Sequence, residues 1–141
     1  MSTRCCIGLK GAPRDGCSEV RSIYSHSDGY PSYVGKLLLE NYDTPEKVNQ
    51  LLDLGDISLL GSEIGEKHKF EDRSHPTWCL AYGRDRGEDA DQIKARKHVS
   101  VAEFLLACQE DYTYLFDNGQ WFYRSWDSDL IPLTKDICKN D

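Results

Sequence analysis

Short runs of apolar, β-branched and aromatic residues lie near both ends of the chain and are bounded by turn-forming residues, as is typical of β-strands. Residues 4–9 and 19–25 are predicted to form two short strands joined by the turn-forming sequence GAPRDG. Near the other end, aromatic runs flank residues 117–120 (DNGQ), and Asn-Gly between such runs is the strongest short signal for a hairpin. The pattern therefore predicts a β-hairpin at each end of the chain.

Three segments between the hairpins place apolar residues three and four positions apart, the spacing of one helix face. Each segment opens with a helix-start signal, either a proline in the first turn or a serine or threonine that serves as N-cap. The last segment also has a glutamate three residues after its serine, which predicts a capping box. The predicted helices cover residues 32–42, 45–54 and 100–108.

The remaining segments complete the predicted order ββααβαββ. Residues 77–83 (TWCLAYG) are an apolar run without helical period and predict a buried strand, whereas residues 83–97 have the composition of a solvated loop. This order predicts an α+β fold, in which an antiparallel sheet built from the N- and C-terminal hairpins carries about three helices. We expect one domain over residues 1–141, with a C-terminal tail from about residue 127.

Composition excludes several classes of function. With 141 residues the chain is long enough to bury a core, and its formal net charge of −7 argues against non-specific binding to nucleic acid duplexes or anionic lipid. The first residues lack the apolar stretch of a secretion signal, and no run of eighteen apolar residues is present. We therefore expect a cytoplasmic protein without a membrane partner.

The six cysteines include no C-x-x-C pair, a spacing that is poor for zinc. Two of them, Cys5 and Cys6, are adjacent. In a reducing cytoplasm, a chain of this size needs no disulfide bridges. We expect six free thiols, no metal and no cofactor.

The sequence HSDGYP at residues 26–31 is the first candidate site. It connects a predicted strand to the start of a predicted helix, where free backbone N–H groups and the positive end of the helix dipole favour anions. His26 and Tyr30 add hydrogen-bond donors, and Asp28 lies between them. The alternative is purely structural: Asp28 and Gly29 form a turn, while His26 and Tyr30 fill space.

The sequence YGRDRGE at residues 82–88 is the second candidate site. On an extended segment, alternate residues point the same way, so Arg84 and Arg86 would present two guanidinium groups side by side next to Tyr82. Guanidinium groups match phosphate and carboxylate oxygens. If the two strand ends are neighbours, both candidate sites share one cleft; the alternative is a solvated run whose acidic residues neutralise the arginines.

His26 and Asp28 are also the alternative candidates for acid–base catalysis, although this spacing is common in structural networks. The chain lacks G-x-S-x-G, a Walker loop and H-E-x-x-H. The candidate residues suit the holding of negative charge better than the breaking of bonds. Binding without catalysis is therefore the preferred prediction, with no residue assigned as catalytic.

Several motifs together resemble a family of small proteins, without an assigned activity, carried by bacteriophages and prophages. They are H-x-D-G-Y-P, G-x-x-L-L-E-x-Y, Y-x-R-D-R-G-E and a closing Y-x-Y-L-F-x-x-G-x-W hairpin, within about residues 19–124. In that family the residue after the histidine is usually tryptophan, whereas here it is Ser27. The resemblance implies a phage accessory protein in the cytoplasm of the infected host, with counter-defence as one role.

Three functions follow from these observations. The first is a binding protein that captures a small anionic, nucleotide-type ligand through the residues of the two candidate sites. The second is an acidic inhibitor that occludes a host defence protein, and the third is a small hydrolase that acts on a nucleotide signal through His26 and Asp28. The sequence leaves the oligomeric state open, including a homo-oligomer.

Overall fold

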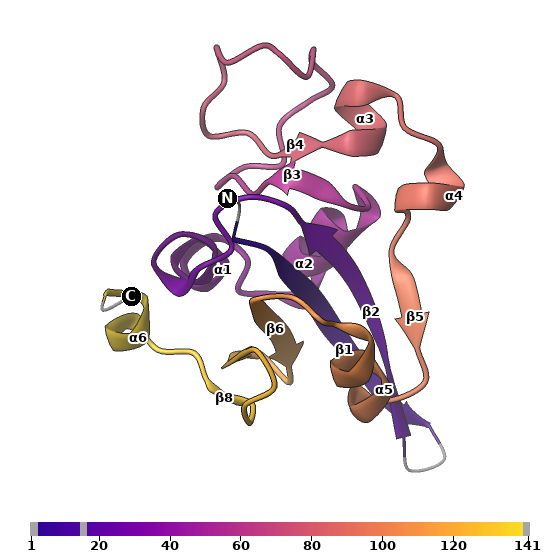
Figure 1. Cartoon of the computed structure of the whole chain (residues 1–141), viewed down its shortest axis with the longest axis vertical. Helices are drawn as coiled ribbons and strands as arrows, with labels where there is room; N and C mark the ends of the chain where they lie inside the picture. The colour runs from indigo at the N-terminus through magenta and orange to yellow at the C-terminus, as the bar shows by residue number, and fades with distance from the viewer. Residues whose placement is uncertain (1–2, 15–16, 140–141) are drawn as a thin grey trace.

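The computed structural model describes residues 3–14 and 17–139, which form an α+β fold around one mixed sheet (Figure 1). Both predicted terminal hairpins are confirmed as antiparallel pairs of strands. The pairs are β1 (Cys5–Arg14) with β2 (Cys17–Ser25), and β6 (Tyr112–Asp117) with β7 (Gln120–Ser125). The two hairpins are joined by parallel pairing of β1 with β6. The residue pattern of the strands does not predict this pairing.

Four short strands complete the sheet, whose order is β4-β3-β2-β1-β6-β7-β8, with β5 also paired to β2. They are β3 (Ile57–Leu59), β4 (Leu80–Ala81), β5 (Arg96–His98) and β8 (Ile131–Pro132). β1 pairs with one edge of β2, and two of the short strands pair with the other edge. β5 pairs antiparallel with residues 20–22, and β3 pairs parallel with Ser25. β5 and β3 therefore follow one another along the same edge of β2.

The three predicted helices are confirmed. They are η1 (Pro31–Gly35) continued by α1 (Lys36–Asn41), then α2 (Pro45–Asp53) and α5 (Val101–Ala107). The predicted N-caps function as such, because the Thr44 and Ser100 hydroxyl groups accept hydrogen bonds from backbone N–H groups three residues later. These caps satisfy donors that the first helical turn leaves free, and so fix where α2 and α5 begin.

Other helices lie in segments for which none was predicted. They are α3 (Tyr82–Arg86), α4 (Ala90–Ile93) and α6 (Lys135–Lys139). The strand predicted over residues 77–83 is therefore limited to β4, and the solvated loop predicted over residues 83–97 contains α3, α4 and part of β5. The segment expected as a C-terminal tail includes β8 and α6, and its residues Leu133 and Cys138 are buried.

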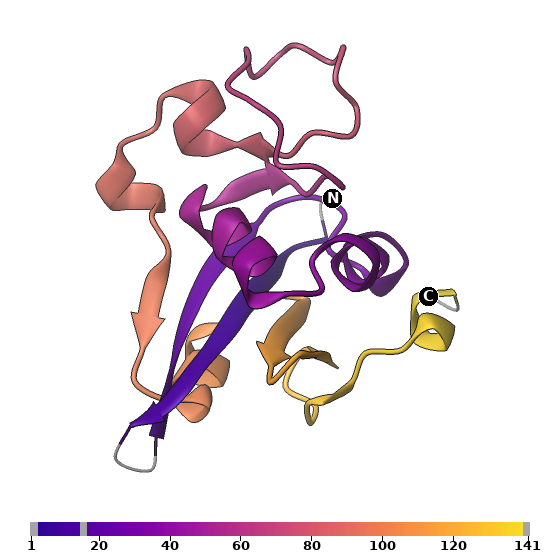
Figure 2. The ribbon, with the colours of Figure 1, turned by 180° about the vertical axis from the view of Figure 1, so that it is seen from behind.

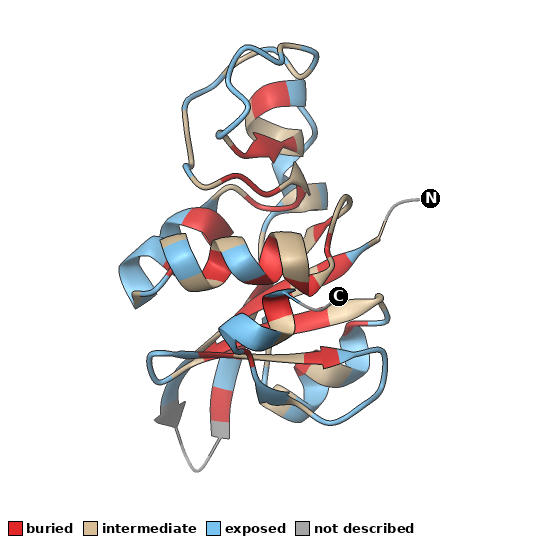
Figure 3. Ribbon diagram, turned by 90° about the vertical axis from the view of Figure 1, so that its left-hand side faces the viewer, coloured by how far each residue is buried: buried red, intermediate tan, exposed pale blue. Residues whose placement is uncertain are grey.

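Helices cover both faces of the sheet, with α2 on one face and α5 on the other (Figures 1 and 2). On the first face, Ile7 and Ile23 belong to the larger core, which α1 and α2 complete. On the opposite face, Val20 and Leu115 pack with Phe104 of α5 in a smaller core. Figure 3 shows the buried residues gathered where the helices meet the strands. Because α5 is short, the smaller core covers only part of its face.

A disulfide joins Cys6 of β1 to Cys108 directly after α5, with the two Cα atoms 6.2 Å apart. The prediction of six free thiols is therefore wrong for this pair. The reason is that 102 residues separate the two cysteines along the chain, so only the packing of α5 on the sheet reveals their proximity. Cys5 and Cys79 are free thiols and are buried, as is Cys138, and the side chain of Cys17 lies outside the described part of the chain.

Candidate functional site

The two predicted candidate sites lie on opposite sides of β3. Ser25 at the end of β2 pairs with Ile57, and Ile57 pairs in turn with Ala81 at the end of β4. The backbone N–H of His26 donates to the Ile57 carbonyl, and that of Tyr82 donates to the Asp56 carbonyl. The two strand ends thus approach the same short strand, but they are not direct neighbours in the sheet.

The HSDGYP segment forms a turn that is bonded to the sheet. His26 Nδ1 lies 2.7 Å from the Tyr24 hydroxyl, and Asp28 adopts a left-handed backbone conformation with φ of 55°. Gly29 is buried: its N–H donates to the Thr3 carbonyl, and its own carbonyl accepts from a buried tyrosine hydroxyl, that of Tyr114. Tyr30 caps the start of η1 through its backbone, with its carbonyl accepting the first N–H bonds of the helix.

Arg84 and Arg86 do not lie on an extended segment, because residues 82–86 form α3. At helical spacing, positions two apart point to different sides, so the two guanidinium groups are not parallel. Arg84 donates at 2.7 Å to the Ile64 carbonyl, at 2.8 Å to the Cys79 carbonyl and at 2.9 Å to the Asp85 carboxylate. This arginine therefore joins backbone segments of its own fold.

Asp85 is the anionic partner of Arg84 and is buried. Burial by itself raises the pKa of Asp85, but hydrogen bonds from Arg84 and from the backbone N–H groups of Ala81 and His68 outweigh it and lower the pKa. Arg86 instead packs over the Tyr82 ring, at 4.8 Å from its centroid, and pairs with a nearby glutamate at 3.0 Å. The predicted arginines thus have partners within the protein.

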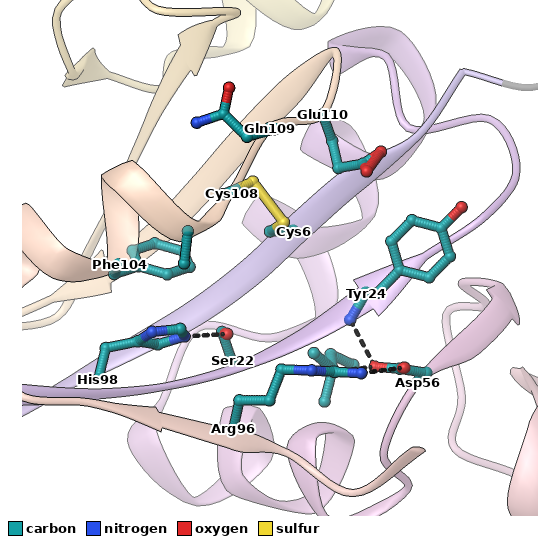
Figure 4. Close-up of a pocket in the computed structure, with 12 residues that line it drawn as sticks. Cys6, Ser22, Tyr24, Asp56, Arg96, His98, Phe104, Cys108, Gln109 and Glu110 are labelled. Atoms are coloured by element: carbon teal, nitrogen blue, oxygen red, sulfur yellow. Dashed lines mark hydrogen bonds and ion pairs between the residues drawn. A yellow bond between two sulfur atoms is a disulfide. The ribbon is translucent and has the colours of Figure 1, made fainter. Parts of the chain in front are cut away.

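A pocket of about 320 Å³ lies on the face of the sheet that α5 covers only in part (Figure 4). We call it the sheet-face pocket. Strand β2 contributes its floor, β5 and the residue before β3 one side, and α5 with the following disulfide the other side. Its walls include Ser22, Tyr24, Asp56, Arg96, His98 and Phe104.

An ion pair between Arg96 and Asp56 forms one end of the sheet-face pocket. Nη1 of Arg96 lies 2.6 Å from one carboxylate oxygen and Nη2 lies 2.8 Å from the other, so the pair is bidentate. Asp56 is buried and also accepts the backbone N–H of Tyr24 at 2.9 Å. The hydrogen bonds to Asp56 raise the pKa of the Arg96 guanidinium, which is therefore a fixed positive charge.

A serine and a histidine also line the same pocket. The Ser22 hydroxyl lies 2.8 Å from His98 Nε2, and the His98 ring leans against Phe104 with centroids 5.3 Å apart. Burial and, secondly, the positive charge of Arg96 lower the pKa of His98 below its usual value. His98 is therefore neutral at pH 7 and has one ring nitrogen free of a proton.

A second cavity, of about 440 Å³, lies between α1 and α6, and we call it the lysine pocket. Helix α1 contributes residues at positions i, i+3 and i+4, which lie on one helix face, and so does α6. These residues are Lys36, Leu39 and Glu40, and Lys135, Cys138 and Lys139. Within the described chain, none of the three lysines forms an ion pair. The pocket thus gathers positive charge in an acidic protein.

A glycine permits the two helices of the lysine pocket to approach each other. A side-chain carbon at Gly35 would lie 3.2 Å from the Cys138 sulfur and 3.4 Å from a Leu133 methyl group. Gly35 ends η1, so the missing side chain lets α6 pack directly on that helix. Among residues 3–14 and 17–139, no cluster of three or more His, Cys, Asp or Glu side chains suited to a metal occurs.

Neither pocket was predicted from the sequence. Arg96 and His98 fall in the polar run that predicts a loop, and the lysines of α6 fall in the expected tail. Weak signals were present, since Arg96 and His98 alternate as in a strand, and Lys135 and Lys139 have the spacing of one helix face. Such short signals are not distinguishable from those of solvated segments.

No protein-family model matches the chain, and neither a curated protein nor a solved structure matches it significantly. Among the helices of the described ranges, none has the length and apolar character needed to cross a membrane.

Proposed function

We propose that this protein binds a small anionic ligand in the lysine pocket and holds it without chemical conversion. The observation that carries the proposal is the convergence of Lys36, Lys135 and Lys139 on one cavity without a carboxylate partner among the described residues for any of them. Like charges held together repel one another, and an anion relieves that repulsion.

The charge of the rest of the chain makes this cluster unusual. Acidic residues outnumber basic ones by 24 to 17, and other lysines pair with aspartates, as Lys10 does with Asp117 and Lys47 with Asp43. In the lysine pocket, three ammonium groups and the single carboxylate of Glu40 leave two positive charges. This balance suits a ligand with about two negative charges, such as a phosphate monoester.

The size and lining of the lysine pocket support a ligand with an apolar part. A volume of about 440 Å³ lies within the usual range for small-molecule sites, and Leu39 and Cys138 supply apolar surface beside the charges. A nucleotide combines a phosphate with a flat base and fits this description. The lining contains no histidine and only one carboxylate, so it lacks the pair of groups that acid–base catalysis needs.

The resemblance to phage-borne proteins gives the proposal a biological setting. A phage accessory protein that captures a nucleotide signal in the host cytoplasm would lower its free concentration and weaken the defence that depends on it. Capture needs affinity and abundance, and it needs no catalysis. We propose the lysines of the lysine pocket as ligand-binding residues in place of Arg84 and Arg86. Both arginines already contact other groups of the protein.

A second candidate function is occlusion of a host protein, and exposed apolar side chains favour it. Trp126 is 59% exposed and Leu106 is 69% exposed, and both line a groove after α5 together with Glu110 and Asp127. Exposed tryptophan is enriched at the centres of protein interfaces. The acidic residues at this groove would suit a basic partner.

Calorimetric titration of the purified chain with AMP, ADP, cyclic AMP and inorganic phosphate tests ligand capture. The variant K36Q/K135Q should bind at least about tenfold more weakly than the wild type, because each lysine contributes charge to the site. K67Q/K69Q is the matched control, since it removes two lysines from the exposed loop and leaves the lysine pocket intact. Equal binding by both variants, or no heat with any of the four compounds, would contradict the proposal.

A further inference from the structure

The sheet-face pocket holds a set of groups that ligand capture in the lysine pocket does not use. In the pairing of β2 with β5, Val20 lies opposite His98 and Ser22 lies opposite Arg96. Opposed residues of an antiparallel pair, and residues two apart on one strand, point to the same face. Ser22, Arg96 and His98 therefore all face the partly covered side of the sheet, as Figure 4 shows.

The contact between Ser22 and His98 has the geometry of a nucleophile and its base. Their side-chain atoms are 2.8 Å apart, and Ser22 lines the pocket although most of the residue is buried. Two charged groups act on His98: Arg96 disfavours its protonation and Glu103 favours it, while burial also disfavours it. The balance leaves an imidazole that is neutral at pH 7 and can accept the proton of the serine hydroxyl.

Arg96 supplies the third element, a fixed positive charge on the strand residue that pairs with Ser22. Asp56 orients its guanidinium through two hydrogen bonds, and a weaker contact of 3.5 Å runs to the Gln92 carbonyl. A guanidinium has five N–H groups, so N–H groups remain that no described residue accepts. A preorganised donor of this kind stabilises negative charge that develops on a carbonyl oxygen during attack.

We propose that the sheet-face pocket hydrolyses small carboxylic esters, with Ser22 as nucleophile, His98 as general base and Arg96 as the stabiliser of the oxyanion. The Ser22 oxygen bonds to the carbonyl carbon of the ester, and its proton passes to His98 Nε2. The bond from that carbon to the alcohol oxygen then breaks, and His98 returns the proton to the departing alcohol. The acyl group remains on Ser22.

Water completes the cycle in the same way. A water oxygen bonds to the acyl carbon while His98 Nε2 takes a proton from the water. The bond to the Ser22 oxygen then breaks, and His98 returns the proton to Ser22. The sum is one ester and one water converted to one carboxylic acid and one alcohol, with no change of oxidation state.

The walls of the sheet-face pocket restrict the substrate. A volume of about 320 Å³ admits only a small molecule, and the rings of Phe104 and Tyr24 favour an apolar or aromatic group beside the ester. The disulfide between Cys6 and Cys108 forms part of the wall and ties the end of α5 to β1, which fixes the width of the pocket.

Two measurements on the full chain test this activity. The first follows p-nitrophenolate release from p-nitrophenyl acetate, and the second maps the adduct of a fluorophosphonate, which loses fluoride when a serine oxygen attacks it. We expect the adduct on Ser22 alone, none in S22A, and ester hydrolysis at least tenfold slower in both S22A and H98Q. Glutamine retains a hydrogen-bonding group near Ser22 but cannot act as the base.

Controls separate catalysis from folding and from the lysine pocket. S27A, outside the sheet-face pocket, and K36Q/K135Q should hydrolyse the ester at the wild-type rate, and urea denaturation should show that S22A and H98Q fold. The wild-type rate should fall on acidification with a midpoint below the usual histidine pKa. An adduct on another serine, no adduct at all, or an unchanged rate in folded H98Q would overturn the proposal without bearing on nucleotide capture.

Discussion

Arg96 and Asp56 are 40 residues apart in the sequence, yet the guanidinium of one holds both carboxylate oxygens of the other, at 2.6 and 2.8 Å. Asp56 also accepts the backbone N–H of Tyr24, so one buried carboxylate joins β5, β2 and the residue before β3. β5 and β3 are the two strands that pair with the outer edge of β2. The ion pair therefore stabilises the sheet-face pocket at the point where the partner of β2 changes from β5 to β3.

Replacement of Asp56 by alanine should destabilise the fold by about 2 kcal/mol, because the Tyr24 N–H and the Arg96 guanidinium both lose their acceptor. Urea denaturation measures the change. D53A is the control, since Asp53 forms a similar ion pair with Arg21 but its side chain is 70% exposed. We expect D53A to remain within about 1 kcal/mol of the wild type. Equal losses in the two variants would mean that Asp56 has no special structural role.

Removal of the disulfide in C6S/C108S should lower the free energy of unfolding by about 2–5 kcal/mol, because the bridge restricts a long loop in the unfolded chain. Thermal denaturation with and without a thiol reductant measures this effect. The reductant should lower the melting temperature of the wild type and leave that of the double variant unchanged. Thiol titration of the denatured, non-reduced protein should count two fewer than six, and a count of six would contradict the bridge.

Arg84 and Arg86 should differ sharply in their effect on stability. R84A removes the side-chain donor to two backbone carbonyls and the cationic partner of the buried Asp85, and we expect a loss of about 2–3 kcal/mol. R86A removes a half-exposed pair with Glu88 and a ring contact with Tyr82, so about 1 kcal/mol is expected. Chemical denaturation of the two single variants compares them, and similar losses would show that the burial of Arg84 is unimportant.

Acid should destabilise the wild type partly through His98. Its folded pKa is lowered, so protons bind the unfolded state more readily, and the stability that this difference provides is present above about pH 6.5. It is lost as pH falls through the unfolded and then the folded pKa. Urea denaturation between pH 7.5 and pH 5 should show a smaller loss in H98Q than in the wild type. Parallel pH profiles would mean that the environment of His98 does not disfavour its charge.

The predicted elements that the structure confirms are those with strong local signals. Asn118 and Gly119 both have positive φ, of 52° and 83°, which is the backbone of a tight hairpin turn that Asn-Gly adopts readily. Thr44 and Ser100 cap their helices as their sequence context predicts. Interactions within three or four residues decide these features, so they can be read without knowledge of the fold.

Short elements stabilised by distant partners could not be predicted in this way. Strand β5 consists of three polar residues and forms because it can pair with the edge of β2 that β1 does not occupy. Arg96 has an ion-pair partner only because folding brings Asp56 close to it. The Cys6–Cys108 bridge likewise depends on how α5 lies on β1. Polar sequences of this kind are equally compatible with a solvated loop until the sheet supplies their hydrogen bonds.

The two hairpins, the three main helices, the α+β class and the acidic character can be predicted from the amino-acid sequence, because they depend on local patterns, on capping and on charge that can be counted. The location of the candidate sites depends on the tertiary structure. In the folded chain, Arg84 donates to a backbone carbonyl, Lys36 and Lys135 from two helices line one pocket, and Ser22 contacts His98 across two strands. Each of these depends on contacts between residues far apart in the chain, which packing of the whole sheet and its helices must fix first.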